Sequence, residues 1–282
     1  MTDIGFLNDR FMSLEEVKIS PDDRGFQFGD GVYEVVMVYE GKPCLLQEHL
    51  ARLEHSAQGI RLTLPYTPAE WEQRILEGVK RCGYQHCKVY IQVTRGIVPR
   101  DHLFPGQCSP TIFMSFREMT PLDENLRQRG VKVITVPDIR WGRCDIKSLN
   151  LLPNVLGKQQ AKEAGAFEAI FIREGVVTEG TSCNVMIVRS GVIHTPESNH
   201  HILEGVTRKI LLDLAKKEGL SVCERTIKAK ELFEVDEIFL AGTTIEVMPV
   251  VAIDEKPVGT GQPGPTSQQL SASYQDFLSR LV

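Results

Sequence analysis

Lys147 stands between a strand-like run and a helix-like run, in the stretch WGRCDIKSLN of residues 141–150. On a protein surface a lysine is an ordinary solvated charge. In a cleft with little water, a lysine loses part of its preference for the proton and becomes a nucleophile toward carbonyl carbons. Most lysines are surface residues. Taken alone, Lys147 is therefore better explained as a surface residue.

Two further segments offer groups that complement a reactive lysine. Glu179 precedes a glycine and two hydroxyl residues in VTEGTSCN, which is typical of a hairpin turn but also suits a carboxylate facing a cationic ring nitrogen. The tetrapeptide EGVT, which ends at Thr207, opens a predicted helix. Backbone N–H groups and a hydroxyl at a helix start form a natural phosphate site, whereas a simple N-cap role for Thr207 is the alternative.

Arg52 and Thr243 allow the same two interpretations. Arg52, in EHLARLE, is either a solvated helix residue or a phosphate ligand, and Thr243, in AGTTIE, belongs either to a turn or to a phosphate site. A nucleophilic lysine, an acid near a ring nitrogen and a phosphate anchor are together what pyridoxal 5′-phosphate requires. The sequence contains no GxGxxG, GxxxxGK[ST] or HExxH motif that favours another cofactor or a metal.

Composition excludes several other classes of protein. The net charge of −5 argues against a nucleic-acid-binding surface, and no apolar run reaches membrane-spanning length. The seven cysteines include no C-x-x-C pair, so neither a zinc site nor a disulfide framework is indicated. The amino-terminal segment lacks the features of a signal peptide. We therefore expect a cytoplasmic enzyme without a metal, a nucleic-acid partner or a membrane segment.

The pattern of hydrophobic residues predicts alternating hairpins and helices. Residues 32–39, 87–94 and 110–116 are predicted strands, and residues 46–60 and 68–81 are predicted helices, the second with Thr67 as its N-cap. After a predicted linker at 118–125 come a strand, a helix near 153–165, two hairpins, a helix over 206–218, a strand and a terminal helix. We expect an α+β (mixed α/β) fold with a smaller domain at 1–120 and a larger one at 121–282.

The ordered set of motifs resembles the fold-type IV pyridoxal-phosphate enzymes, and among them the bacterial D-amino-acid aminotransferases. The resemblance covers almost the whole chain, through DRGFQFGDGVYEVV, YIQVTRGIVPRDH, DIRWGRCDIKSLNLL, VTEGTSCNV, LEGVTR and GTTIEVMPV. It implies two domains with the active site between them. It further implies that Lys147 binds the cofactor covalently and that Glu179 keeps the pyridine nitrogen protonated. The remaining cofactor residues that it implies are Arg52, Ser182, Leu203, Val206, Thr207 and Thr243.

The segment RGIVPRDH carries the features that distinguish substrates within the family. In D-amino-acid aminotransferases, an arginine and a histidine at the spacing of Arg100 and His102, with a tyrosine matching Tyr33, bind the substrate carboxylate. Directed donors of this kind suit a carboxylate well. The family's arginine and histidine reach the site from the neighbouring subunit, so the resemblance also implies a homodimer.

The resemblance implies a transaminase that moves the amino group between D-amino acids, such as D-alanine, and 2-oxo acids, such as 2-oxoglutarate and pyruvate. The alternatives with the same cofactor are a branched-chain L-amino-acid aminotransferase, an (R)-selective amine transaminase and aminodeoxychorismate lyase. A further alternative is a non-catalytic binding protein of the same fold. Ile245 and the tail GTGQPGP depart from the D-specific pattern, which concerns the preferred side chain more than the type of reaction.

Overall fold

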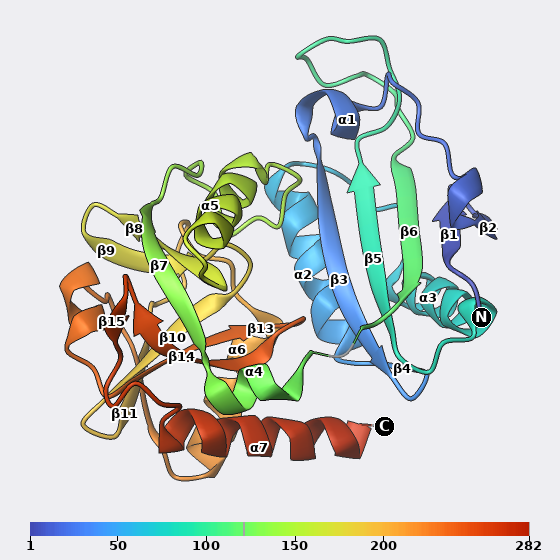
Figure 1. Cartoon of the computed structure of the whole chain (residues 1–282). Helices are drawn as coiled ribbons and strands as arrows, with labels where there is room; N and C mark the ends of the chain where they lie inside the picture. Colours follow the sequence, from blue (N-terminus) through green and yellow to red (C-terminus); the bar gives the residue numbers. More distant parts are fainter. Residues whose placement is uncertain (121, 282) are drawn as a thin grey trace. The chain divides into compact units, whose positions relative to one another are not determined.

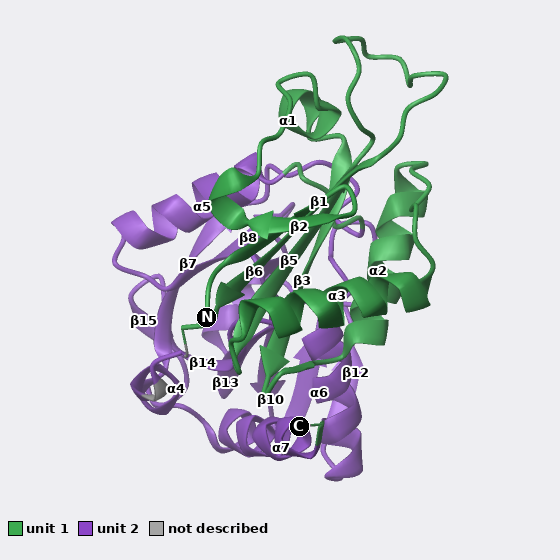
Figure 2. Cartoon of the chain, turned by 90° about the vertical axis from the view of Figure 1, so that its right-hand side faces the viewer, with its two compact units in different colours: residues 1–120, 146–150, 281–282 green, residues 121–145, 151–280 purple. Residues whose placement is uncertain are grey.

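The computed structural model describes residues 1–120 and 122–281, which group into two compact units. The first unit contains residues 1–120, 146–150 and 281–282, and the second contains 121–145 and 151–280 (Figure 2). Segment 146–150, which includes Lys147, groups with the first unit although both of its flanks belong to the second. The domain ranges 1–120 and 121–282, which stay a prediction, assign this segment to the second part.

The first unit is built on a six-stranded antiparallel sheet with the order β2-β1-β6-β5-β3-β4. Its helices α2 and α3 pack on this sheet, α2 against β3 and α3 against β1 and β6 (Figure 1). The elements are β1 (Ile4–Leu7), β2 (Arg10–Ser13), η1 (Leu14–Glu16), α1 (Arg24–Phe28), β3 (Gly31–Tyr39), β4 (Lys42–Pro43), α2 (Leu46–Gly59), α3 (Pro68–Cys82), β5 (Cys87–Thr94) and β6 (Thr111–Glu118).

The core of the first unit follows the alternation of its strands. Side chains along a strand point alternately to the two faces, so every second residue of β3 and β5 faces the helices. The fully buried apolar residues of these strands are Val32, Val36, Val38, Cys87, Val89, Ile91 and Val93. The same alternation places Glu34, a charged residue that is also fully buried, on the core face of β3.

Helix α3 begins and ends where its local sequence dictates. Thr67 is the N-cap and forms a capping box with Glu70, while Pro68 occupies the first turn, where its missing N–H costs nothing. Gly83 follows the last turn in the left-handed conformation, with φ of 74°. The predicted helix and its predicted N-cap are therefore confirmed.

The second unit is built on a nine-stranded mixed sheet, with the order β12-β11-β10-β13-β14-β7-β8-β9 and with β15 paired to β14. Parallel pairs join β7 to β8, β7 to β14 and β11 to β12. The elements are α4 (Glu124–Arg129), β7 (Val131–Pro137), α5 (Leu152–Glu163), β8 (Glu168–Arg173), β9 (Val176–Gly180), β10 (Asn184–Arg189), β11 (Val192–Thr195), α6 (Val206–Lys217), β12 (Ser221–Glu224), η2 (Ala229–Phe233), β13 (Glu237–Gly242), β14 (Glu246–Ile253), β15 (Lys256–Pro257) and α7 (Pro265–Leu281).

Several local predictions for the second unit are confirmed and two are corrected. The predicted hairpin turns 174–175 and 190–191 have positive φ at both central residues, as tight hairpins require. The N-cap of α6 is Gly205, so the interpretation of Thr207 as an N-cap is wrong. Strand β14 is an additional element that was not predicted, and it carries Pro249 in its middle although proline is disfavoured in central strands.

We expect Gly78→Ala to destabilise the protein, although alanine is the better helix former. An added Cβ at position 78 lies 2.1 Å from Cζ of the buried Phe116 ring on β6. Overpacking of this kind costs about 1–3 kcal/mol, which outweighs the gain of about 1 kcal/mol in helix propensity. Thermal unfolding should show a lower melting temperature for this variant.

Gly142→Ala is the matched control, because no atom lies within 4 Å of a Cβ added there. Its melting temperature should stay close to that of the unaltered protein. A Gly78→Ala protein as stable as this control would contradict the close packing of α3 on β6.

Candidate active site

Lys147 lies in the first unit, where its backbone is fixed on both sides. Its N–H donates to Oγ of Ser56 on α2 at 3.1 Å, and its carbonyl oxygen accepts from the N–H of Tyr33 at 3.0 Å. The half-buried side chain places Nζ 4.4 Å from the centroid of the Tyr33 ring. A cation over the face of an aromatic ring is attracted to it. The ammonium is therefore directed toward β3.

The rest of segment 146–150 pairs with the start of β3. Ser148 forms a β-bridge with Val32, and the N–H of Leu149 donates to the carbonyl of Gly31 at 3.1 Å. Ile146 packs so closely on α2 that a Cβ added at Gly59 meets its side chain at 2.8 Å. Segment 146–150 thus acts as a short extra strand, and this explains why it groups with the first unit.

Glu34 joins Arg52 and His49 in a buried group beneath α2. Arg52 donates from Nε to Oε1 of Glu34 at 2.6 Å and from Nη2 to Oε2 at 2.9 Å. Nδ1 of His49 lies 2.8 Å from the same Oε2. A bidentate pair of this kind fixes the plane of the guanidinium group. Arg52, a predicted phosphate ligand, is therefore held in one orientation.

Charge and burial determine the protonation of this group. Burial opposes the ionised form of Glu34, but the charge and hydrogen bonds of Arg52 hold the pKa of this carboxyl well below its ordinary value. Burial lowers the pKa of His49, and the nearby charges of Arg52 and Lys147 lower it further, against the opposing effect of Glu34. Near neutral pH, Glu34 is ionised and His49 is neutral, so Nδ1–H of His49 donates to the carboxylate.

The structure brings Arg100 and His102 together at Phe28. The guanidinium carbon of Arg100 lies 4.3 Å from the centroid of the Phe28 ring, and the His102 ring centroid lies 5.3 Å from the same ring. Arg100 and His102 are both exposed. Tyr33 lies on the opposite face of β3 from the core, with its ring 5.8 Å from that of Tyr90. Tyr33 therefore adjoins Lys147 in its own chain, while Arg100 and His102 form a separate exposed pair.

In the second unit, Glu179 receives donors on both carboxylate oxygens. Nη1 of Arg140 pairs with Oε1, the N–H of Leu203 donates to Oε2 at 3.1 Å, and Nδ2 of Asn184 approaches Oε2 at 3.3 Å. Asn184 also donates to the carbonyl of Leu203 at 2.9 Å. Glu179 and Leu203, both predicted site residues, are therefore joined by Asn184.

Arg140 is the cation that balances this group. It is buried, and it forms hydrogen bonds with both oxygens of Asp138, at 2.8 and 2.9 Å. Burial opposes the charge, but Asp138 and Glu179 together raise the pKa of Arg140 above its ordinary value. Burial likewise opposes the charge of Asp138, and hydrogen bonds from Arg140 and Arg173 lower the pKa of Asp138. A fully ionised network therefore surrounds Glu179.

The start of α6 lies next to Asn184. A Cβ added at Gly205 meets Oδ1 of Asn184 at 2.0 Å, so a larger residue at this N-cap would displace the Asn184 side chain. The N–H groups of Val206 and Thr207 belong to the first turn, where helices have no internal acceptors, and the positive end of the helix dipole adds to their attraction for an anion. Thr207 is buried. This start is suited to a phosphate.

Ser182 and Thr243 lie at the same end of the sheet. Asn184 and Gly242 are at the adjoining ends of the paired strands β10 and β13, and a Cβ added at Gly242 lies 3.4 Å from the carbonyl oxygen of Ser182. Thr243 follows Gly242 directly in the turn to β14. The second unit thus gathers all its predicted cofactor residues in one region.

Sequence analysis did not identify Glu34, His49, Arg140 or Asn184 as members of these groups. The signal for Glu34 is available, because it is a carboxylate at an inward position of an alternating strand. Cys144, which lies three residues before Lys147, is buried, and burial raises the pKa of its thiol to about 11. This thiol is accordingly a packing residue.

Among residues 1–120 and 122–281, no cluster of histidine, cysteine or carboxylate side chains is suited to a metal ion. Within the same residues, no helix has the length and apolar character to cross a membrane.

We expect Glu34→Gln to destabilise the protein by about 3 kcal/mol near neutral pH, because it removes the fully buried carboxylate that pairs with the largely buried guanidinium of Arg52. The folded-state pKa of Glu34 is depressed, so the stabilisation is present above the ordinary value of 4.5 and decreases as the pH falls below it. Denaturant unfolding from pH 7 to pH 3 should show this difference narrowing.

Glu48→Gln, at an exposed position on α2, the helix that carries Arg52, is the control and should change stability little at any pH. If the two variants behaved alike at pH 7, the buried pair would not have the assigned role.

Comparison with known proteins places this architecture in a family. The model of the family Amino-transferase class IV matches residues 31–253. The chain is 44% identical over 272 residues to the D-alanine aminotransferase of Bacillus licheniformis, covering 96% of this chain and 95% of that protein. It is 40% identical over 273 residues to the D-alanine aminotransferase of Staphylococcus haemolyticus, covering 97% of both.

Among solved structures, the T.th. branched-chain amino acid aminotransferase with pyridoxamine 5′-phosphate superposes with a TM-score of 0.91 at 30% identity, covering 100% of this chain and 96% of that one. The predicted fold type IV, with its mixture of helices and sheets, is confirmed. So is the predicted class of enzyme. The chain belongs to the class IV aminotransferases.

Proposed function

We propose that the protein is a pyridoxal-phosphate-dependent transaminase that moves the amino group between D-amino acids, such as D-alanine, and 2-oxo acids, such as 2-oxoglutarate and pyruvate. The observation that carries this proposal is the near-complete match to D-alanine aminotransferases. The likeness to branched-chain enzymes is lower in identity. Arg100, His102 and Tyr33, which distinguish the D-specific enzymes, are all present in this chain.

The residues of both units fit the proposed cofactor. We assign the phosphate to the first turn of α6, where N–H groups converge on a glycine N-cap. Ser182 and Thr243 adjoin this region, and the fixed guanidinium of Arg52 is suited to the same anion. We assign the ring nitrogen to Glu179 and the ring face to Leu203. The complete set is Arg52, Lys147, Glu179, Ser182, Leu203, Val206, Thr207 and Thr243.

Glu179 is the residue that sets the charge of the ring. Arg140 pairs with its Oε1, which favours the ionised carboxylate. An ionised carboxylate accepts a hydrogen bond from a protonated ring nitrogen and stabilises the positive charge there. When bound, pyridoxal phosphate draws the electron pair released at the substrate carbon into its ring. Glu179 and Arg140 together maintain the ring charge on which this chemistry depends.

Lys147 serves both as the covalent anchor and as the base. Its amine would hold the cofactor, and once a substrate amine has displaced it, Nζ would act as the base that takes the proton from the substrate Cα. The hydrogen bonds of its backbone to Ser56 and Tyr33 fix the point from which the side chain extends. Proton transfer is therefore confined to one face of the substrate.

We assign the substrate carboxylate to Tyr33, Arg100 and His102, with Arg100 and His102 contributed by the partner in a homodimer. The exposure of these two side chains, which both contact Phe28, supports this assignment. A carboxylate held on one side directs the Cα–H of the D-isomer toward Lys147. The seven free thiols favour a reducing compartment, so we place the enzyme in the cytoplasm.

A coupled assay with pyruvate or 2-oxoglutarate as acceptor should show turnover of D-alanine. L-leucine and (R)-1-phenylethylamine should react at least about 100-fold more slowly, because each lacks a carboxylate in the required position or has the opposite hand. Faster turnover of L-leucine would establish the branched-chain alternative. A protein that remains colourless after addition of pyridoxal phosphate would establish the non-catalytic alternative.

Borohydride reduction followed by peptide mapping should place the trapped cofactor on Lys147. Lys147→Ala should abolish this adduct and lower turnover by at least about 1,000-fold while the protein remains folded. Lys158→Ala, which removes a partly exposed lysine on α5, is the control and should leave the adduct in place. An adduct on any other lysine would overturn the assignment.

Mixing two inactive variants tests whether Arg100 acts in the partner's site. Lys147→Ala and Arg100→Ala chains should each be inactive or nearly so. After subunit exchange, half of the dimers combine one chain of each kind, and each of these contains one intact site if Arg100 acts across the interface. The mixture should then regain about one quarter of the normal number of sites. No recovery in a mixture proven to contain mixed dimers would place Arg100 in its own chain's site.

A further inference from the structure

The loop between β5 and β6 carries Arg100 and His102, and Arg24 holds its backbone. Nη1 of Arg24 donates to the carbonyl of Asp101 at 2.6 Å and approaches that of Leu103 at 3.3 Å. These two carbonyls flank His102 on both sides. Arg24 is buried, and its guanidinium carbon lies 4.8 Å from the centroid of the Phe28 ring. The backbone on both sides of His102 is therefore tied to a buried side chain.

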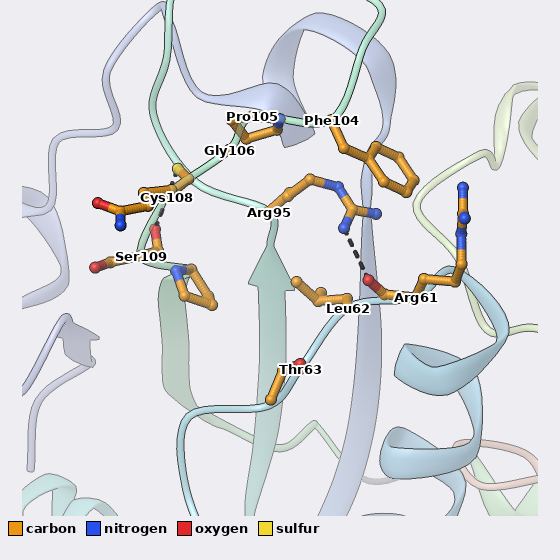
Figure 3. A pocket seen from close by; sticks show the side chains of 11 residues that line it. Arg61, Leu62, Thr63, Arg95, Phe104, Pro105, Gly106, Cys108 and Ser109 are labelled. Atoms are coloured by element: carbon orange, nitrogen blue, oxygen red, sulfur yellow. Dashed lines mark hydrogen bonds between the residues drawn. The ribbon is translucent and has the colours of Figure 1, made fainter.

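A second buried arginine holds the same loop further along. Arg95 lies over the ring of Phe104, with its guanidinium carbon 3.8 Å from the ring centroid, and that of Arg61 lies 4.8 Å from the same centroid. Figure 3 shows the Phe104 ring beside both guanidinium groups. Nη1 of Arg95 also donates to the carbonyl of Arg61 at 3.0 Å. The ring of Phe104 attaches the loop to these cations although 47% of the residue is exposed.

One carboxylate orients both buried arginines. Oδ2 of Asp30 accepts from Nε of Arg24 at 2.8 Å and from Nε of Arg95 at 2.9 Å, and Oδ1 accepts from Nη2 of Arg95 at 2.9 Å. Burial opposes the charge of Asp30, but the hydrogen bonds and charges of Arg95 and Arg24 lower the pKa of this carboxyl. Asp30 thus remains ionised and fixes the planes of both guanidinium groups.

A pocket beside the second half of the loop makes the contacts of Arg24 and Phe104 important for its conformation. A cavity of about 680 Å³ lies between the loop and the body of the first unit, and it is lined by Arg61, Leu62, Thr63, Arg95 and residues 104–110 (Figure 3). The pocket is open to solvent, and residues 104–110 have little packing on the side that faces it. Backbone hydrogen bonds of Gly96 and Val98 to residues 22–24 hold the first part of the loop, and Arg24 and Phe104 hold the part that follows.

We propose that Asp30, Arg24, Arg95 and Phe104 form a loop clamp that positions Arg100 and His102 for the substrate carboxylate. The inference rests on the proposed function, because it assigns the clamp to the carboxylate site of a D-amino-acid transaminase. All four are positioning residues. They act on substrate affinity through the loop and do not contact the reacting atoms.

Phe104→Leu tests the clamp with little risk to folding, because the side chain is exposed. It retains an apolar side chain of similar size and removes the ring. The KM for D-alanine and for pyruvate should rise about tenfold, while kcat changes by less than about threefold. Hydrogen–deuterium exchange over residues 97–109 should become faster, at an unchanged oligomeric state.

Phe104→Tyr retains the ring and should restore both the KM values and the exchange rates, and Gln107→Ala, at an exposed position in the same loop, is a neutral control. Wild-type KM values for the leucine variant would overturn the proposal. Equal damage by tyrosine and leucine would also overturn it, because the ring would then not be the active element.

Asp30→Asn provides a second measurement, with Asp22→Asn at an exposed position as the matched control. Asp30→Asn should weaken the contacts of both Arg24 and Arg95 with the loop. It should therefore raise the KM values for D-alanine and for pyruvate more than Phe104→Leu does. If this variant does not fold, the variants at position 104 decide. If the unaltered protein does not use D-alanine, the proposed function fails and exchange alone decides on the clamp: unchanged exchange in Phe104→Leu overturns it.

Discussion

The need to balance buried guanidinium groups organises the functional residues of this protein. A charge out of water is costly unless a partner of opposite charge and suitable geometry lies beside it. Arg52 has Glu34, Arg140 has Asp138 and Glu179, and Arg24 shares Asp30 with Arg95. In each case the carboxylate also fixes the plane of the guanidinium group. The same interactions that make burial tolerable therefore also determine where each cation points.

These groups are placed by strand ends and helix starts, where side chains and backbone N–H groups are available. The ends of β10 and β13, together with the first turn of α6, bring the N–H groups of that turn and the carboxylate of Glu179 into one region of the second unit. In the first unit, segment 146–150 pairs with the start of β3, and this pairing fixes the backbone position of Lys147. The proposed function assigns the base, the ring charge and the substrate carboxylate to separate groups of residues.

Much of the fold could be predicted from the sequence, because local patterns determine it. The alternation in 87–94 gave the buried face of β5, and Thr67 with Pro68 gave the start of α3. The chemistry of Lys147 and Glu179 could be inferred only from their combination with a phosphate site and from the resemblance to a family. The buried ion pairs escaped prediction, because Glu34 and Arg52 lie 18 residues apart and only tertiary packing joins them. Strand β14 could not be predicted from local sequence, because Pro249 is disfavoured in a central strand and only the neighbouring strands determine whether it is accommodated.

The place of segment 146–150 in the chain has a consequence for biosynthesis. The first 120 residues leave the ribosome before the five residues that complete the edge of their sheet at Gly31 and Val32. During this interval the nascent chain exposes unpaired backbone groups along the start of β3, an arrangement that invites association with other chains. Since the closing segment also carries Lys147, the edge of the sheet is completed in the same step of synthesis that adds this lysine.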